Sequence, residues 1–313
     1  MSNNRKNLKE IKISFAGLDN AGKTSALIAL RQKYNFQEKV KNLKPTIKVD
    51  YSSFTFLNRF SINLWDMGGQ EKYRSIYVNN PIYFSGTDYL YFLIDIQDEL
   101  QFQTAVDYLF DLIRILEKID YNNEIIICFH KYDPKLRENE DYLDRTKMIK
   151  NLILSEHSDL NFIFFKTSVY DISSISKAVS YAINRLLNLK TINKKFDQLI
   201  EQDLCKHAIL YTNSGLIIAD EYSEVMDTRD FQQLISDQMN EDLEFFQRLS
   251  DEEVHMDERI TFNDEMVQYV KRYELTTDNG PISLYIGIST DSDRINHAKL
   301  KLKQYKSHLE TLI

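Results

Sequence analysis

The feature that most constrains this chain is the run Gly17-Leu-Asp-Asn-Ala-Gly-Lys-Thr24. It fits the pattern G-x-x-x-x-G-K-[ST], a loop whose backbone N–H groups can surround phosphate oxygens. Residues 11–16 before it alternate apolar and polar side chains as a strand does, and residues 25–31 after it are good helix formers. A chance glycine turn before a helix would explain the glycines alone. The order strand, loop, helix predicts a nucleotide-binding α/β domain.

Within this loop, Lys23 is predicted to reach the β- and γ-phosphates, and the Thr24 hydroxyl is predicted to ligate Mg²⁺. The N-terminus of the following helix adds partial positive charge. Further residues of the loop are predicted to contact the nucleotide, namely Asp19, Asn20, Ala21, Gly22 and Ser25.

A second motif, Trp65-Asp-Met-Gly-Gly-Gln70, follows a predicted strand over residues 60–64. Asp66, at the end of that strand, can hold a water of the Mg²⁺ ion. Gly69 lets its backbone N–H approach the γ-phosphate because no Cβ intervenes. Gln70 is then placed to orient the attacking water, as a catalytic residue. A plain Gly-Gly turn after a strand gives no use for the aspartate and the glutamine.

Base recognition is predicted after the apolar run 124–129, which is typical of a buried parallel strand. The next residues are His130-Lys-Tyr-Asp133, at the carboxyl end where open α/β sheets bind ligands. Asp133 would accept hydrogen bonds from guanine N1–H and the 2-amino group, whereas adenine offers neither donor. The stem of Lys131 can cover the base. Ser168 and Val169 end another apolar strand and could supply backbone contacts to guanine O6.

Over residues 8–189 the chain resembles a Ras-superfamily GTPase. The phosphate loop and the Trp-Asp-x-Gly-Gly-Gln run are similar to those of Arf and Gα proteins. Residues 46–50, 56–66 and 167–171 resemble the Rag/Gtr family more closely, as does His130 in place of the common Asn. Because this position is usually Asn, the sequence alone does not define the contact that His130 makes.

The resemblance implies a six-stranded, mostly parallel sheet with helices on both faces, over a domain of residues 1–190. It implies GTP or GDP as ligand and Mg²⁺ as cofactor. Thr46, in Lys44-Pro-Thr-Ile47, lies where regulatory GTPases place a second Mg²⁺ ligand, although taken alone such a segment is usually an ordinary loop. The function implied is a molecular switch with slow GTP hydrolysis. An Arf-like traffic GTPase and a GTP-loaded assembly subunit with little turnover are the alternatives.

Residues 191–313 are predicted to form a second, α+β domain of order α-β-β-α-β-β-β-α, after a helix over 173–190 and a polar joint over 191–195. This order resembles the roadblock/longin-like domain of Rag GTPases. One helix face is predicted to carry five apolar residues, Phe231, Ile235, Met239, Leu243 and Phe246. The helices would cover one face of the sheet and leave the other face, or an edge strand, for a partner. The resemblance implies a homodimer, or a heterodimer with a related GTPase, together with activating and exchange proteins.

Composition and charge add limits to this interpretation. The two cysteines, Cys128 and Cys205, lie in apolar runs and are predicted to be core residues. No transmembrane segment, signal peptide or lipidation motif is recognised, so we expect a cytoplasmic protein without its own membrane anchor, recruited to membranes by partners if at all. Residues 219–265 hold sixteen acidic and three basic residues. That excess indicates a solvated acidic surface, or a docking surface for a basic partner, and disfavours nucleic acid as a ligand.

Overall fold

A computed structural model describes residues 8–31, 43–185, 187, 189–223, 229–262 and 266–312. The chain divides into two compact units between Ala178 and Val179. We call them the N-terminal and the C-terminal unit. The division lies inside α6 (Ile172–Asn184), and the domain boundary between residues 190 and 191 stays a prediction.

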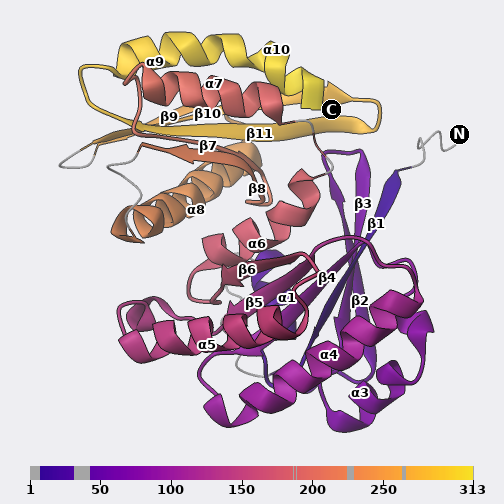
Figure 1. Ribbon diagram of the computed structural model, residues 1–313. Coiled ribbons are helices and arrows are strands. Elements are labelled where there is room, and N and C mark those ends of the chain that lie inside the picture. The colour runs from indigo at the N-terminus through magenta and orange to yellow at the C-terminus, as the bar shows by residue number, and fades with distance from the viewer. Residues whose placement is uncertain are drawn as a thin grey trace, which may run out of the picture. The chain divides into compact units, whose positions relative to one another are not determined.

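The N-terminal unit is built on a six-stranded sheet of order β2-β3-β1-β4-β5-β6, in which only β2 is antiparallel to its neighbour (Figure 1). The mostly parallel six-stranded sheet predicted from the sequence is therefore confirmed. The strands are β1 (Lys9–Gly17), β2 (Val49–Phe56), β3 (Phe60–Met67), β4 (Tyr89–Asp95), β5 (Ile125–His130) and β6 (Phe162–Lys166). The helices, besides α6, are α1 (Lys23–Arg31), α3 (Glu71–Val78), α4 (Phe102–Lys118) and α5 (Glu140–Glu156).

Helices cover both faces of this sheet because its central strands are apolar on both sides. Every residue of β5 is buried, as the continuous apolar run predicted. On one face, α3, α4 and α5 pack against β4 and β5 in a single hydrophobic cluster. On the other face, the Tyr91 hydroxyl of β4 donates to the Ala178 carbonyl of α6 at 2.7 Å. Cys128 is buried in β5 with a free thiol, as predicted, and burial raises its pKa to about 12.

The C-terminal unit is an antiparallel sheet of order β8-β7-β11-β10-β9, and its element order is the one predicted. The strands are β7 (His207–Thr212), β8 (Ile217–Tyr222), β9 (Glu258–Phe262), β10 (Val267–Thr277) and β11 (Gly280–Thr290). The helices are α7 (Lys190–Glu201), α8 (Arg229–Asp251), α9 (Ile295–Leu302) and α10 (Lys306–Leu309). Cys205 precedes β7 as a buried free thiol, again as predicted.

The polar joint predicted over residues 191–195 is wrong, because these residues belong to α7, and the preceding helix ends at Asn184 rather than at residue 190. Three apolar residues of α7 fall at helical spacing and are buried, namely Ile192, Phe196 and Leu199. The lysines and asparagine that suggested a joint lie between these buried positions, on the polar side of an amphipathic helix.

Among the described residues, helices pack on both faces of the C-terminal sheet, which contradicts the predicted option of one face left free for a partner. On one face, α8 buries Ile235, Met239, Leu243 and Phe246, as predicted from their spacing; the side chain of Phe231 lies outside the described residues. On the other face lie α7, α9 and α10 (Figure 1): the Tyr273 hydroxyl donates to the Leu302 carbonyl at 2.6 Å. The second option, an edge strand, stays open, because β8 and β9 are the two edges of the sheet in the described part of the chain.

Candidate nucleotide-binding site

The phosphate loop joins β1 to α1, so the predicted order of strand, loop and helix is present. Asn20 turns the chain with a φ of 59°, in the left-handed region that asparagine tolerates. The Lys23 ammonium is buried and donates to the carbonyls of Gly17 at 3.0 Å and Leu18 at 2.7 Å. Burial lowers the pKa of Lys23 to about 8, although the nearby Asp66 and Asp19 carboxylates oppose this shift.

The three predicted Mg²⁺ residues, Thr24, Thr46 and Asp66, come together from three different segments of the chain. The Thr24 hydroxyl donates to Asp66 Oδ2 at 2.5 Å, the Thr46 hydroxyl donates to the same oxygen at 3.0 Å, and the two hydroxyl oxygens lie 2.9 Å apart. Among the described residues Asp66 Oδ1 has no hydrogen-bond partner, although it is buried. Burial raises the pKa of Asp66. This all-oxygen set with an unsatisfied carboxylate oxygen fits a hard cation such as Mg²⁺.

Gly69 lies directly against the phosphate loop. A Cβ on Gly69 would come within 2.4 Å of the Leu18 carbonyl and the Asp19 nitrogen, so only glycine fits. Gln70 follows immediately as the N-cap of α3, where its carbonyl accepts hydrogen bonds from the backbone N–H groups of Tyr73 and Arg74. Gly69 thus brings the start of α3 next to the phosphate loop, and the catalytic role of Gln70 stays a prediction.

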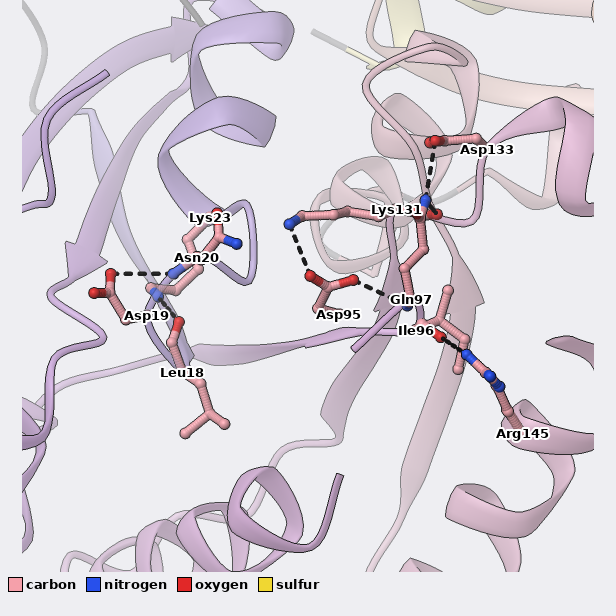
Figure 2. Close-up of polar contacts among 10 residues, drawn as sticks. All are labelled: Leu18, Asp19, Asn20, Lys23, Asp95, Ile96, Gln97, Lys131, Asp133 and Arg145. Carbon is pink, nitrogen blue, oxygen red and sulfur yellow. Dashed lines mark hydrogen bonds and ion pairs between the residues drawn. The ribbon is translucent and has the colours of Figure 1, made fainter. Parts of the chain in front are cut away.

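The base-recognition residues meet at the carboxyl ends of β4, β5 and β6. Figure 2 shows Lys131 and Asp133 beside Asp95 and Gln97. The Ser168 hydroxyl donates to Asp133 Oδ1 at 2.6 Å, and the Gln97 amide donates to Asp133 Oδ2 at 3.0 Å. Lys131 has a φ of 58°, and its ammonium pairs with Asp95 at 2.7 Å. The two charged residues of the motif, Lys131 and Asp133, are thus held by the end of β4 with the loop that follows it, and by the segment after β6.

His130 connects the base-recognition strand with the phosphate loop. Its Nδ1 lies 2.9 Å from the Thr167 hydroxyl, on the segment after β6. Its ring packs against Gly22, where a Cβ would fall 2.4 Å from ring atom Cδ2. The histidine is fully buried, and burial lowers its pKa to about 3, so the ring is neutral near pH 7. A neutral, packed His130 therefore bridges two loops of the site.

The remaining predicted residues lie around this frame. Asp19 and Asn20 are exposed at the tip of the phosphate loop, and Ala21 is buried beneath it. Ser25 is half-buried in the first turn of α1, and Val169 is half-buried just after Ser168.

Sequence reasoning missed Asp95 and Gln97. Asp95 is the last residue of the buried strand β4, and Gln97 follows two residues later. A signal was available, because polar residues at the carboxyl end of a buried parallel strand lie at the ligand-binding edge of the sheet.

A family model described as the Gtr1/RagA G protein conserved region matches residues 12–251. The chain belongs to the Gtr1/RagA family. This membership confirms the Rag/Gtr resemblance recognised in the motifs. Within the described residues of this Gtr1/RagA-family chain, no helix is long and apolar enough to cross a membrane.

Among curated proteins, this Gtr1/RagA-family chain is 27% identical over 211 residues to GTP-binding protein GTR1 of Saccharomyces cerevisiae, covering 64% of each chain. It is 26% identical over 182 residues to ADP-ribosylation factor-like protein alp41 of Schizosaccharomyces pombe, covering 58% of this chain and 89% of that protein. A solved structure of the Arl6 BBS3 small GTPase from Trypanosoma brucei, with bound GppNp, is 17% identical and covers 56% of this chain and 97% of that one, with a TM-score of 0.45.

His130 gives the stability of the N-terminal unit a pH dependence that can be measured. Below pH 6.5 the unfolded chain protonates this ring, whereas the folded chain resists protonation down to pH about 3. Stability is therefore lost as the pH falls through this window, by roughly 2 kcal/mol between pH 7 and pH 5. His130→Asn should lack this loss. Urea unfolding followed by the fluorescence of Trp65, the one tryptophan of the chain, measures it.

As a control, His157→Asn removes a half-buried histidine at the end of α5 in the same unit, and should keep the wild-type pH dependence. Equal losses in wild type and His130→Asn would show that the ring is not held neutral by its site.

Proposed function

We propose that this chain is a guanine-nucleotide switch that binds GTP or GDP with Mg²⁺ and slowly hydrolyses GTP. The observation that carries the proposal is the meeting of Thr24, Thr46 and Asp66. It joins the phosphate loop to two other segments, so a ligand bound at this point would be sensed by all three. GTP-binding protein GTR1, which this chain resembles, supports the choice of nucleotide.

The residues divide the work of binding and hydrolysis. Lys23 would release the carbonyls that it now contacts and pair with the β- and γ-phosphates. Thr24 and Thr46 would hold a Mg²⁺ ion directly, with Asp66 acting through water; the ion would neutralise charge on the phosphate oxygens. Gln70 would orient the attacking water. Because the γ-phosphate would hold the segments around Thr46 and Gly69, its loss would release them.

The intrinsic rate is expected to be low. Position 44, two residues before Thr46, is Lys, where the Gα proteins that the motif resembles carry Arg. An arginine supplied by an activating protein would raise turnover by about 10³- to 10⁵-fold. We place the protein in the cytoplasm, with exchange and activating proteins as regulators.

We also infer that the C-terminal unit pairs with a second copy or a related GTPase as a roadblock/longin-like domain. Strand β9 is the edge that best suits pairing, since Ile260 is 41% exposed and Phe262 is 72% exposed. An edge strand offers unpaired backbone groups to a partner strand, and these apolar side chains would be buried alongside.

Guanine selectivity tests the nucleotide assignment. The wild type should bind GDP more tightly than ADP by about 10²-fold or more, because two hydrogen bonds to the Asp133 carboxylate are available only to guanine. Asp133→Asn should lose this preference and gain affinity for XDP, because the amide can donate to the C2 carbonyl of xanthine. Equilibrium titration measures both. The control Asp144→Asn alters an exposed carboxylate on α5 and should change nothing. Equal wild-type affinity for ADP and GDP would contradict the assignment.

Gln70→Leu tests catalysis. It should slow single-turnover GTP hydrolysis by at least about tenfold while leaving GTP affinity nearly unchanged, because the side chain acts on the water rather than on the bound nucleotide. Gln103 is an exposed glutamine of α4 with no assigned part in positioning the water, so Gln103→Met is a suitable control and should hydrolyse GTP at the wild-type rate. If the wild type itself shows no turnover, the chain is instead a GTP-loaded assembly subunit.

Phe262→Lys tests pairing. We expect the wild type to sediment as a dimer at micromolar concentrations, alone or with a related chain, and the variant as a monomer, because a lysine on an edge strand blocks pairing. Tyr170→Lys changes another exposed aromatic residue, in the N-terminal unit, and should leave the dimer intact. A variant that dimerises like the wild type would rule out β9 as the interface.

A further inference from the structure

The loop after β4 contacts both charged residues of the base-recognition motif through an uninterrupted set of polar contacts (Figure 2). The Asp95 carboxylate binds the Lys131 ammonium through Oδ2 at 2.7 Å and accepts from the Gln97 backbone N–H through Oδ1 at 3.0 Å. The Gln97 side-chain amide then donates twice, to the Lys131 carbonyl at 2.8 Å and to Asp133 Oδ2 at 3.0 Å. Gln97 therefore links Lys131, the second residue of the motif, to Asp133 at its end.

This loop is itself fastened on two sides. The Ile96 N–H donates to the His130 carbonyl at 3.0 Å, which extends the pairing of β4 with β5 by one residue. The Ile96 carbonyl accepts from the Arg145 guanidinium of α5 at 3.3 Å, and Arg145 also binds Glu99 at 2.8 Å. Because the residue before it is anchored to a strand and to a helix, Gln97 is presented from a rigid support.

The contacts on Asp133 leave room for a base. A carboxylate offers about four acceptor positions, two on each oxygen. Ser168 occupies one position on Oδ1 and Gln97 occupies one on Oδ2. One position on each oxygen is left, which matches the two donors on the guanine edge, N1–H and the 2-amino group. Two protein donors on different oxygens also fix the rotation of the carboxylate.

We propose that Gln97 is a positioning residue for guanine: it holds the Asp133 carboxylate in the plane that accepts both donors of the base. The inference rests on the proposed guanine-binding function and adds to it a residue that sets specificity from a different strand. Gln97 acts through Asp133 and leaves the base contacts to the carboxylate.

The test compares GDP with IDP, whose base lacks the 2-amino group and so places one donor on Asp133. We expect Gln97→Met, which keeps the length of the side chain and removes its donor, to weaken GDP binding by about tenfold. IDP binding should weaken less, because one hydrogen bond tolerates a rotated carboxylate better than two do. The GDP/IDP affinity ratio should therefore fall. Gln97 is exposed, so the variant should keep the wild-type melting temperature.

Two comparisons make the result specific. Gln103→Met removes an exposed amide of α4 that bonds to Asp107, and should leave both affinities unchanged. In an Asp133→Asn background, Gln97→Met should have little further effect on GDP affinity, because the carboxylate that it positions is gone.

Three outcomes would overturn the inference. Unchanged or tighter GDP binding by Gln97→Met would mean that the amide does not assist Asp133, or that it competes with the base. An equal loss for GDP and IDP would mean a general structural role. A wild type without preference for guanine over adenine would remove the proposed function, and this inference with it.

Discussion

The N-terminal unit depends on one carboxylate oxygen, Asp66 Oδ2, that accepts two hydroxyl groups. Thr24 lies in the first turn of α1, Thr46 lies in the connection to β2, and Asp66 lies near the end of β3. Their successive separations in the sequence are 22 and 20 residues. Thr24 can reach the carboxylate only if β3 lies beside β1 in its observed register, in which Phe15 is paired with Asp66. Thr46 depends in the same way on the pairing of β2 with β3, in which Val49 is opposite Met67. Any change in that sheet register would therefore dismantle the site along with the fold.

The parts of this site that could be predicted are those whose residues are neighbours in the sequence. The parts that could not be predicted join residues far apart in the sequence. The phosphate loop and the Gly69-Gln70 turn are each a continuous stretch of sequence. Their glycines are required by the backbone conformation or by close packing, which can be recognised in a single sequence. The contact between Gln97 and Asp133 spans 36 residues and requires knowing that β4 and β5 are neighbours. The role of His130 likewise became clear only when Gly22 and Thr167 were seen on either side of its ring.

In the C-terminal unit, too, patterns within one element could be predicted, whereas packing between elements could not. The periodic apolar residues of α8 predicted this helix correctly, because burial on one face leaves a regular pattern. The sequence pattern could not show that β11 is buried on both faces from Leu284 to Thr290, since that depends on helices contributed by both ends of the unit. Residues 191–195 were misread for a related reason: a short polar stretch is the same in a linker and on the outer side of a helix.

At Lys131 the conformational cost of a left-handed backbone is set against the ion pair that its side chain makes with Asp95. A residue with a Cβ costs on the order of 1 kcal/mol in this conformation, a cost that glycine avoids. A glycine at position 131 would relax the backbone, but it would remove the ammonium that pairs with Asp95 at 2.7 Å. The chain retains a lysine in this conformation because losing its ammonium would leave the largely buried Asp95 carboxylate, 14% exposed, without its ion-pair partner.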